Sequence, residues 1–126
     1  MLTTESPLYD PTHYNMGAVW PFVTGFLAWG HYRYERPWAG YPLVEALGQM
    51  TFDWARGRHP ELLSGAYYRP LDEAVPQQFF ATSMFATSVL SGLLGWEPDA
   101  MAGAARLAPQ LPPQWVQIAL APATGI

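Results

Sequence analysis

The sequence predicts a mainly α-helical fold with short β-strands towards its C-terminal end. Residues 21–35 and 77–94 are apolar around most of a helical circumference, whereas residues 42–56 carry a single apolar stripe. The order is therefore buried helix, amphipathic helix, loop and buried helix. This order is expected of alternating inner and outer helical layers.

The first helix follows an irregular arm. Residues 1–13 are polar and contain two prolines, so we expect no regular structure there. Pro21 fits the first turn of a helix, where its missing N–H is not needed. The helix should continue to about Glu35, and because it is apolar nearly all round, it should be buried nearly all round.

The second helix is expected from Pro42 to about Arg56, because Pro37 and Pro42 both interrupt the preceding segment. Its apolar residues recur at three- and four-residue steps and are Leu43, Ala46, Leu47, Met50 and Trp54. Gly57 and Pro60 supply the signals that end it. The spacing is typical of an outer helix with one buried face.

The segment 59–78 is the organising loop of the chain. Loops of about twenty residues without regular structure are uncommon in compact domains, and they are usually functional or disordered. We expect order, because the loop contains apolar and aromatic residues that need packing partners, namely Leu62, Leu63, Tyr67, Tyr68 and Leu71. After the third helix, a turn is expected at 100–103 and strands at 106–108 and 115–120.

The composition indicates one domain with an unusually apolar surface. Of the 126 residues, 50% are hydrophobic and only 13% are charged, whereas about a quarter is usual. So few charges indicate that much of the surface meets protein, either in a larger body or at a subunit interface.

Several function classes are excluded. The net charge is −4 and the six arginines are scattered, which argues against nucleic-acid binding. The absence of cysteine excludes disulfides and thiolate metal sites. His13, His31 and His59 lack metal-ligand spacing, and no cofactor motif is present. Residues 79–96 are long enough to span a membrane, but their polar and small residues favour a buried helix.

Five short motifs resemble, in the same order, motifs of one glycosidase family. They are Y-x-x-G-x-V-W-P at residues 14–21, P-E-L-L-S-G at 60–65, P-Q-Q-F at 76–79, L-L-G-W-E-P-D-A at 93–100 and L-P-P-Q-W at 111–115. Together they resemble the C-terminal third of the glycogen-debranching (amylo-α-1,6-glucosidase) type of six-hairpin glycosidases. Asn15 and Met16 replace the family's His-Asn pair, and Phe79 replaces its Trp.

The resemblance implies an (α/α)6 toroid of antiparallel helical hairpins. Residues 1–126 would form a single partial domain, with the arm at 1–13, toroid helices at 14–100 and short strands and a tail at 101–126. It also implies inverting hydrolysis of α-glucan-type oligosaccharides by a carboxylic acid and a carboxylate, without a cofactor. Glu61 matches the position of the catalytic base. The acid would belong to an earlier part of the toroid, so we expect this chain alone to be inactive, and to associate with itself or with that part.

The resemblance also suggests substrate-binding residues, which are Trp20, Tyr68, Arg69 and Gln77. Structural roles remain open for all of them. Glu61 could be a surface carboxylate, Arg69 could pair with Asp72, Gln77 could satisfy the start of a helix, and the aromatic rings could serve packing. Adjacent acids such as Asp72 and Glu73 are usually solvated.

Two other functions fit the same residues. A non-catalytic interaction module would bury its apolar helix faces by association. An independent carbohydrate-binding module would bind glucans through its aromatic side chains without cleaving them.

Overall fold

The computed structural model describes residues 3–54 and 56–115, and it is mainly helical. Its elements in order are α1 (Pro21–Arg33), α2 (Pro37–Asp53), α3 (Phe79–Thr87), the π-helical turn η1 (Ser88–Leu93), β1 (Trp96–Asp99) and β2 (Ala104–Leu107). The predicted class, mainly helical with short strands near the C-terminal end, is confirmed, and the two strands pair antiparallel.

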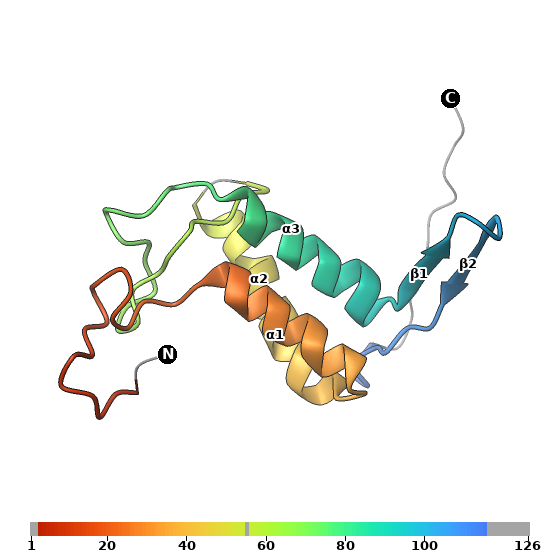
Figure 1. Cartoon of the computed structure of the whole chain (residues 1–126), viewed down its shortest axis with the longest axis horizontal. Coiled ribbons are helices and arrows are strands. Elements are labelled where there is room, and N and C mark those ends of the chain that lie inside the picture. The colour runs from red at the N-terminus through yellow and green to blue at the C-terminus, as the bar shows by residue number, and fades with distance from the viewer. Residues whose placement is uncertain (1–2, 55, 116–126) are drawn as a thin grey trace.

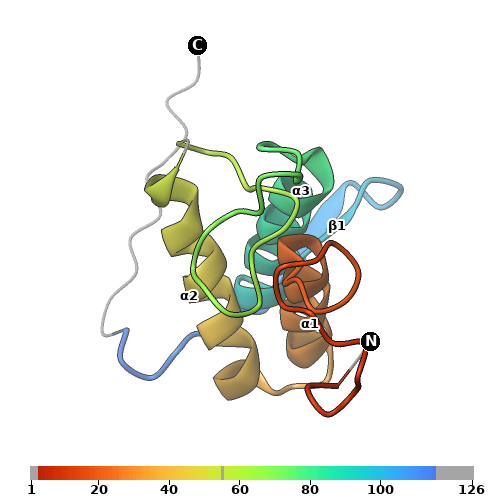
Figure 2. The ribbon, with the colours of Figure 1, turned by 90° about the vertical axis from the view of Figure 1, so that its left-hand side faces the viewer.

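Helices α1 and α3 lie side by side and run in the same direction, whereas α2 runs in the opposite direction (Figure 1). The end-on view places α2 to one side of the α1–α3 layer (Figure 2). Helix α1 packs against both other helices, and α2 has little contact with α3. The three helices therefore form two layers, with α1 and α3 in one and α2 in the other.

The first helix starts where the sequence predicts, with Pro21 in its first turn. Its end is set by Glu35, whose φ of 56° lies in the left-handed region. The expected burial on nearly all sides is wrong, because Val23, Phe26 and Leu27 are exposed. The described part of the chain supplies neighbours on two sides of α1 only, namely α2 and the α3–η1 segment.

The second helix begins five residues earlier than predicted, at Pro37, and Pro42 lies inside it. Pro37 takes the first-turn position after Arg36, whose carbonyl accepts the N–H groups of Ala39 and Gly40. Pro42 has no backbone N–H, so the helix loses one hydrogen bond at this residue. Burial of Val44 against α1 offsets that cost, so tertiary packing outweighs the local rule.

The third helix changes geometry before it ends. It begins at Phe79, two residues later than predicted, and continues as η1, where the Leu94 N–H donates to the Val89 carbonyl at 2.9 Å. A Cβ on Gly92 would lie 2.7 Å from the ring of Tyr32. The wider π turn thus occurs where η1 packs closely against Tyr32 of α1.

The strands form a hairpin with a turn at residues 100–103 and the register Trp96–Leu107. The predicted strand at 106–108 overlaps β2, but β1 was not predicted because it contains Pro98. A proline is tolerated in a two-stranded sheet because both strands are edges. Of the predicted strand at 115–120, Trp115 is not in a strand and the rest lies outside the described residues.

Most of the buried apolar residues form three clusters. One joins the helices (Ala28, Tyr32, Val44, Leu93), one joins α2 to the loop (Leu47, Met50, Leu63) and one belongs to the loop itself (Leu62, Leu71, Ala74). The loop therefore has its own core, as expected from its leucines, although Tyr67 and Tyr68 are exposed. Within the described residues, no helix has the length and apolarity needed to cross a membrane.

Two glycines of α1 test how tightly α1 packs against α3. A Cβ on Gly25 would lie 2.8 Å from Met84 Cβ and 3.0 Å from its carbonyl carbon, whereas Gly30 has nothing within 4 Å. We expect Gly25→Ala to lower the free energy of unfolding by about 1–3 kcal/mol through overpacking. Gly30→Ala should raise it by about 0.5–1 kcal/mol. Urea unfolding of both variants measures this, and equal effects would contradict the close α1–α3 contact.

Candidate functional site

Two segments meet at the N-terminal ends of α1 and α3: the segment 14–20, which leads into α1, and the loop 59–78 (Figure 1). Val19 and Leu63 pair as an antiparallel bridge, each N–H donating to the other's carbonyl at 2.9 Å. Leu63 also bridges to Pro70. The two segments thus form one small unit of paired backbone at the same end of α1 and α3.

Glycines allow this close approach. A Cβ on Gly65 would overlap the carbonyl oxygen of Gly17. A Cβ on Gly17 would in turn lie 2.8 Å from the carbonyl oxygen of Asp10. The lack of a side chain at Gly65 thus lets the loop pack on the arm, and the lack of one at Gly17 lets the arm pack on itself.

Glu61 lies inside this unit and is only 9% exposed. The Tyr14 hydroxyl donates a hydrogen bond to Oε1, and the Val75 N–H donates to Oε2 at 3.1 Å. The Glu61 N–H donates back to the Val75 carbonyl at 2.9 Å. An ionised carboxylate has about four lone-pair sites, so Glu61 keeps acceptor capacity for a water molecule or a proton.

Tyr14 connects Glu61 to Trp20. Its ring meets the Trp20 ring edge-to-face, with centroids 5.4 Å apart, and its backbone N–H donates to Glu73 Oε1 at 3.1 Å. The hydrogen bond to Glu61, together with desolvation, raises the pKa of Tyr14. Its hydroxyl therefore stays protonated and keeps donating to the carboxylate.

The other predicted residues lie elsewhere in the loop. Tyr68 donates to Asp53 at 2.6 Å and packs on Trp54 rather than on Trp20. Arg69 forms an exposed ion pair with Asp72 at 3.3 Å, which is the structural role that the sequence left open.

Gln77 and Gln78 differ in their positions at the start of α3. Gln77 is exposed, and its side chain makes no hydrogen bond to the described residues. Gln78 is the N-cap residue of α3, and its amide oxygen is buried without a donor among the described residues. Gln78, rather than Gln77, therefore presents an unused acceptor near this end of the helix.

Two cavities flank the unit. A polar cavity of about 380 Å³ is lined by Thr12, Ser64, Tyr67, Arg69, Leu71, Asp72 and Glu73. A larger, mainly apolar cavity of about 640 Å³ is lined by Tyr9, Asn15, Gly17, Ala18, Val19, Trp20, Phe22, Val23, Thr24 and Leu27. Trp20 is thus placed on a cavity wall, as a substrate-binding role requires. Glu61 lines neither cavity.

His59 anchors the loop between α2 and α3 and is fully buried. Its Nε2 lies 2.9 Å from the Leu47 carbonyl oxygen, and its Nδ1 lies 3.3 Å from Thr82 Oγ1. Burial lowers the pKa of His59, because a charged imidazole would lose its hydration there.

Sequence reasoning missed the roles of Tyr14 and His59. Tyr14 opens the 14–21 motif, so the sequence drew attention to this segment. Nothing in the motif indicated that Tyr14 would bind Glu61. His59 precedes Pro60 in the loop and gave no signal beyond its position. Both act through partners distant in sequence, so the fold was needed to find them.

Comparisons with known proteins add no relative, since no protein-family model and no curated protein matches the chain. Within the described residues, no group of three or more His, Asp or Glu side chains is arranged to hold a metal ion.

His59 should make folding stability depend on pH. Above pH 6.5 histidine is neutral in both states, but below it the unfolded chain gains a proton that the buried ring does not. The free energy of unfolding should therefore fall as the pH drops from about 6.5 towards the lowered pKa of His59, by at most about 1.4 kcal/mol per pH unit.

Urea unfolding between pH 8 and pH 5 measures this slope. His59→Gln should flatten it, whereas His31→Gln, a partly exposed residue on α1, should retain it. Equal slopes in the unsubstituted protein and in His59→Gln would contradict the assignment.

Proposed function

We propose that α1, α2 and α3 are an inner, an outer and an inner helix of an (α/α)6 toroid. Three features support the proposal: α1 and α3 are parallel, α2 is antiparallel to both, and the segments 14–20 and 59–78 gather at one end (Figures 1 and 2). In such a ring, the segments that lead into the inner helices line the mouth. The motif resemblance points to the same architecture.

Within that ring, we propose that the chain is part of an inverting hydrolase acting on α-glucan-type oligosaccharides, with Glu61 as general base. The observation that carries this proposal is a buried carboxylate held through both oxygens by Tyr14 and Val75, with the Tyr14 ring packed in turn on Trp20. The P-E-L-L-S-G motif that contains Glu61 supports the same role.

In the proposed reaction, Glu61 takes a proton from a water molecule as that water attacks the anomeric carbon. A carboxylic acid from outside these 126 residues protonates the leaving oxygen. The two carboxyl groups of an inverting enzyme stand roughly 6.5–9.5 Å apart, which leaves room for the water. Tyr14 keeps the base oriented, and its backbone is held in turn by Glu73.

Trp20 is the best-supported substrate contact. It lies on the wall of the 640 Å³ cavity, beside the polar side chains of Tyr9 and Asn15. An aromatic face attracts the polarised C–H bonds of a pyranose, because the face of the ring is negative. Hydroxyl-binding groups and an aromatic face thus line one cavity, and Tyr14 links its Trp20 wall to Glu61.

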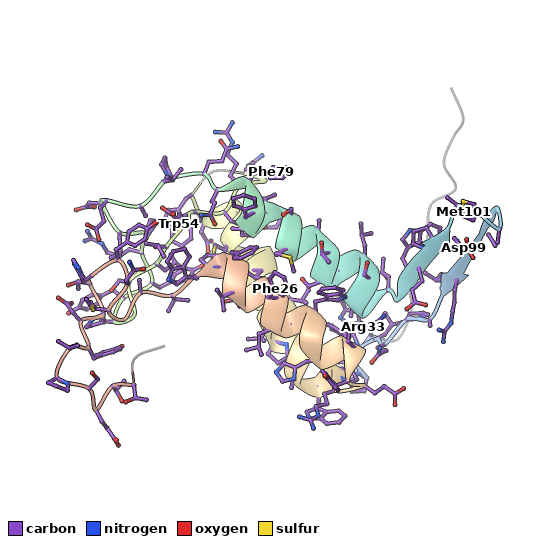
Figure 3. All side chains as sticks on the ribbon, in the orientation of Figure 1. Phe26, Arg33, Trp54, Phe79, Asp99 and Met101 are labelled. Carbon is purple, nitrogen blue, oxygen red and sulfur yellow. The ribbon has the colours of Figure 1, made fainter. Side chains whose placement is uncertain are left out.

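We infer a second role, association, from the exposed side of the α1–α3 layer. Phe26 is 48% exposed and Phe79 is 79% exposed, and both project from this layer (Figure 3). The segment from Phe79 to Leu93 contains no charged residue. Large exposed apolar patches mark interaction sites, so further toroid helices, or a second copy of the chain, would cover this side.

Replacing Glu61 with Gln tests the catalytic proposal. In a protein that contains this chain within a complete ring, Glu61→Gln should lower kcat for malto-oligosaccharide hydrolysis by about 10²–10⁴-fold, since the amide cannot accept the proton. Glu45→Gln, on α2, should leave kcat unchanged. The 126-residue chain alone should be inactive.

Proton NMR of the first product should show the β-anomer, as inversion at an α-linkage requires. A Glu61→Gln enzyme that keeps most of its activity would remove Glu61 from the role. An α-anomer as first product would exclude an inverting mechanism.

Light scattering tests the association proposal. The 126-residue chain should self-associate, and the double variant Phe26→Ser, Phe79→Ser should shift it towards monomer because it removes two apolar contacts. Phe52→Ser, a control on α2 that is 75% exposed, should not. A monomeric unsubstituted chain at high protein concentration would contradict self-association.

A further inference from the structure

A pair of large aromatic rings remains exposed where α2 ends and the loop passes. Trp54 is 40% exposed and Tyr68 is 62% exposed, and neither belongs to the three apolar clusters. Their ring centroids are 5.0 Å apart, with the planes tilted by 46°. Trp54 lies at the end of the molecule where the loop gathers (Figure 3). The rings therefore pack on each other and leave their outer surfaces accessible.

A carboxylate fixes this pair. The Tyr68 hydroxyl donates to Asp53 Oδ2 at 2.6 Å, a short bond of the charge-assisted kind. Desolvation and then this hydrogen bond raise the pKa of Tyr68 to about 12, so the hydroxyl remains a donor at neutral pH. The Tyr68 ring is thus held in place on a loop that has no regular structure.

The free groups at this position suit a sugar. Fixed aromatic rings offer contact area at little entropic cost, and their negative faces attract polarised C–H bonds. Asp53 Oδ1 accepts no hydrogen bond from the residues that the structure describes, so it can accept sugar hydroxyls. Because the rings are tilted rather than coplanar, they match a curved chain better than a flat one.

We propose that Trp54, Tyr68 and Asp53 form an accessory binding site for α-glucan chains, separate from the Glu61 carboxylate. The choice of an α-glucan rests on the proposed function, whereas the site rests on its own geometry. Tyr68 thereby keeps a sugar-binding role, but at the end of α2 rather than beside Trp20.

Binding of maltoheptaose to the 126-residue chain, measured by isothermal titration calorimetry, tests the site. Trp54→Ala and Tyr68→Ala should each weaken binding about tenfold, because aromatic anchors carry most of the energy of such surfaces. Trp38→Ala is the matched control, since Trp38 is 73% exposed near the start of the same helix. Cellohexaose, a flat β-linked chain, should bind more weakly than maltoheptaose.

Circular dichroism of each variant checks folding, and Tyr68→Ala provides the answer if Trp54→Ala does not fold. Unchanged affinity in a folded Trp54→Ala or Tyr68→Ala variant, or an equal loss in Trp38→Ala, would overturn the site. So would a change in oligomeric state without a change in glucan affinity, because the rings would then bind protein.

The outcomes separate the two proposals. Loss of glucan binding in Trp54→Ala, together with full hydrolysis by Glu61→Gln in the complete ring, supports the accessory site and refutes the proposed base. Unchanged glucan binding in Trp54→Ala, together with loss of hydrolysis in Glu61→Gln, refutes the accessory site alone.

Discussion

The buried carboxylate of Glu61 is the constraint on which this end of the molecule depends. An unpaired buried charge is costly, so the loop can place Glu61 inside only if donors come with it. One donor, Val75, lies further along the same loop, and the other, Tyr14, comes from the arm. The arm and the loop must therefore fold together.

Two further contacts help the arm and the loop to fold together around Glu61. They are the backbone pairing of Val19 with Leu63 and the burial of His59. The first joins the arm to the loop, and the second joins the loop to the helices. The apolar cluster of the loop packs against Tyr14 and Trp20 and so adds a further contact between the loop and the arm. Three kinds of interaction thus hold one carboxylate in one orientation.

Much of the helical framework was predictable from the sequence. Proline in the first turn of α1 and the apolar period of α2 are local signals, and both elements were found. The early start of α2 was not found, because the effect of Pro42 depends on how Val44 packs against another helix. Strand β1 was missed for a similar reason, since Pro98 is acceptable only in a sheet that has two edges.

The candidate site was predictable in part. Glu61 and Trp20 carry motif signals, and they do lie in the same unit. Tyr68, in contrast, stands five residues after Leu63 in a loop without period, so nothing local indicates which side its ring faces. Its partners, Asp53 and Trp54, are some fifteen residues earlier in the chain. Only the path of the loop brings them together.

The π turn at η1 has a geometric consequence for the C-terminal part. One helical residue turns the chain by about 100°, and a π turn holds one residue more than an α turn. The end of the helix is therefore rotated about its axis by roughly a quarter-turn relative to an uninterrupted α-helix, and Gly95, with a φ of 59°, then leads the chain into β1. Arg33 of α1 and Arg106 of β2 both reach Glu97 in this orientation. The direction of the hairpin thus depends on the π turn, where the chain passes the ring of Tyr32, and on the left-handed Gly95 that follows it.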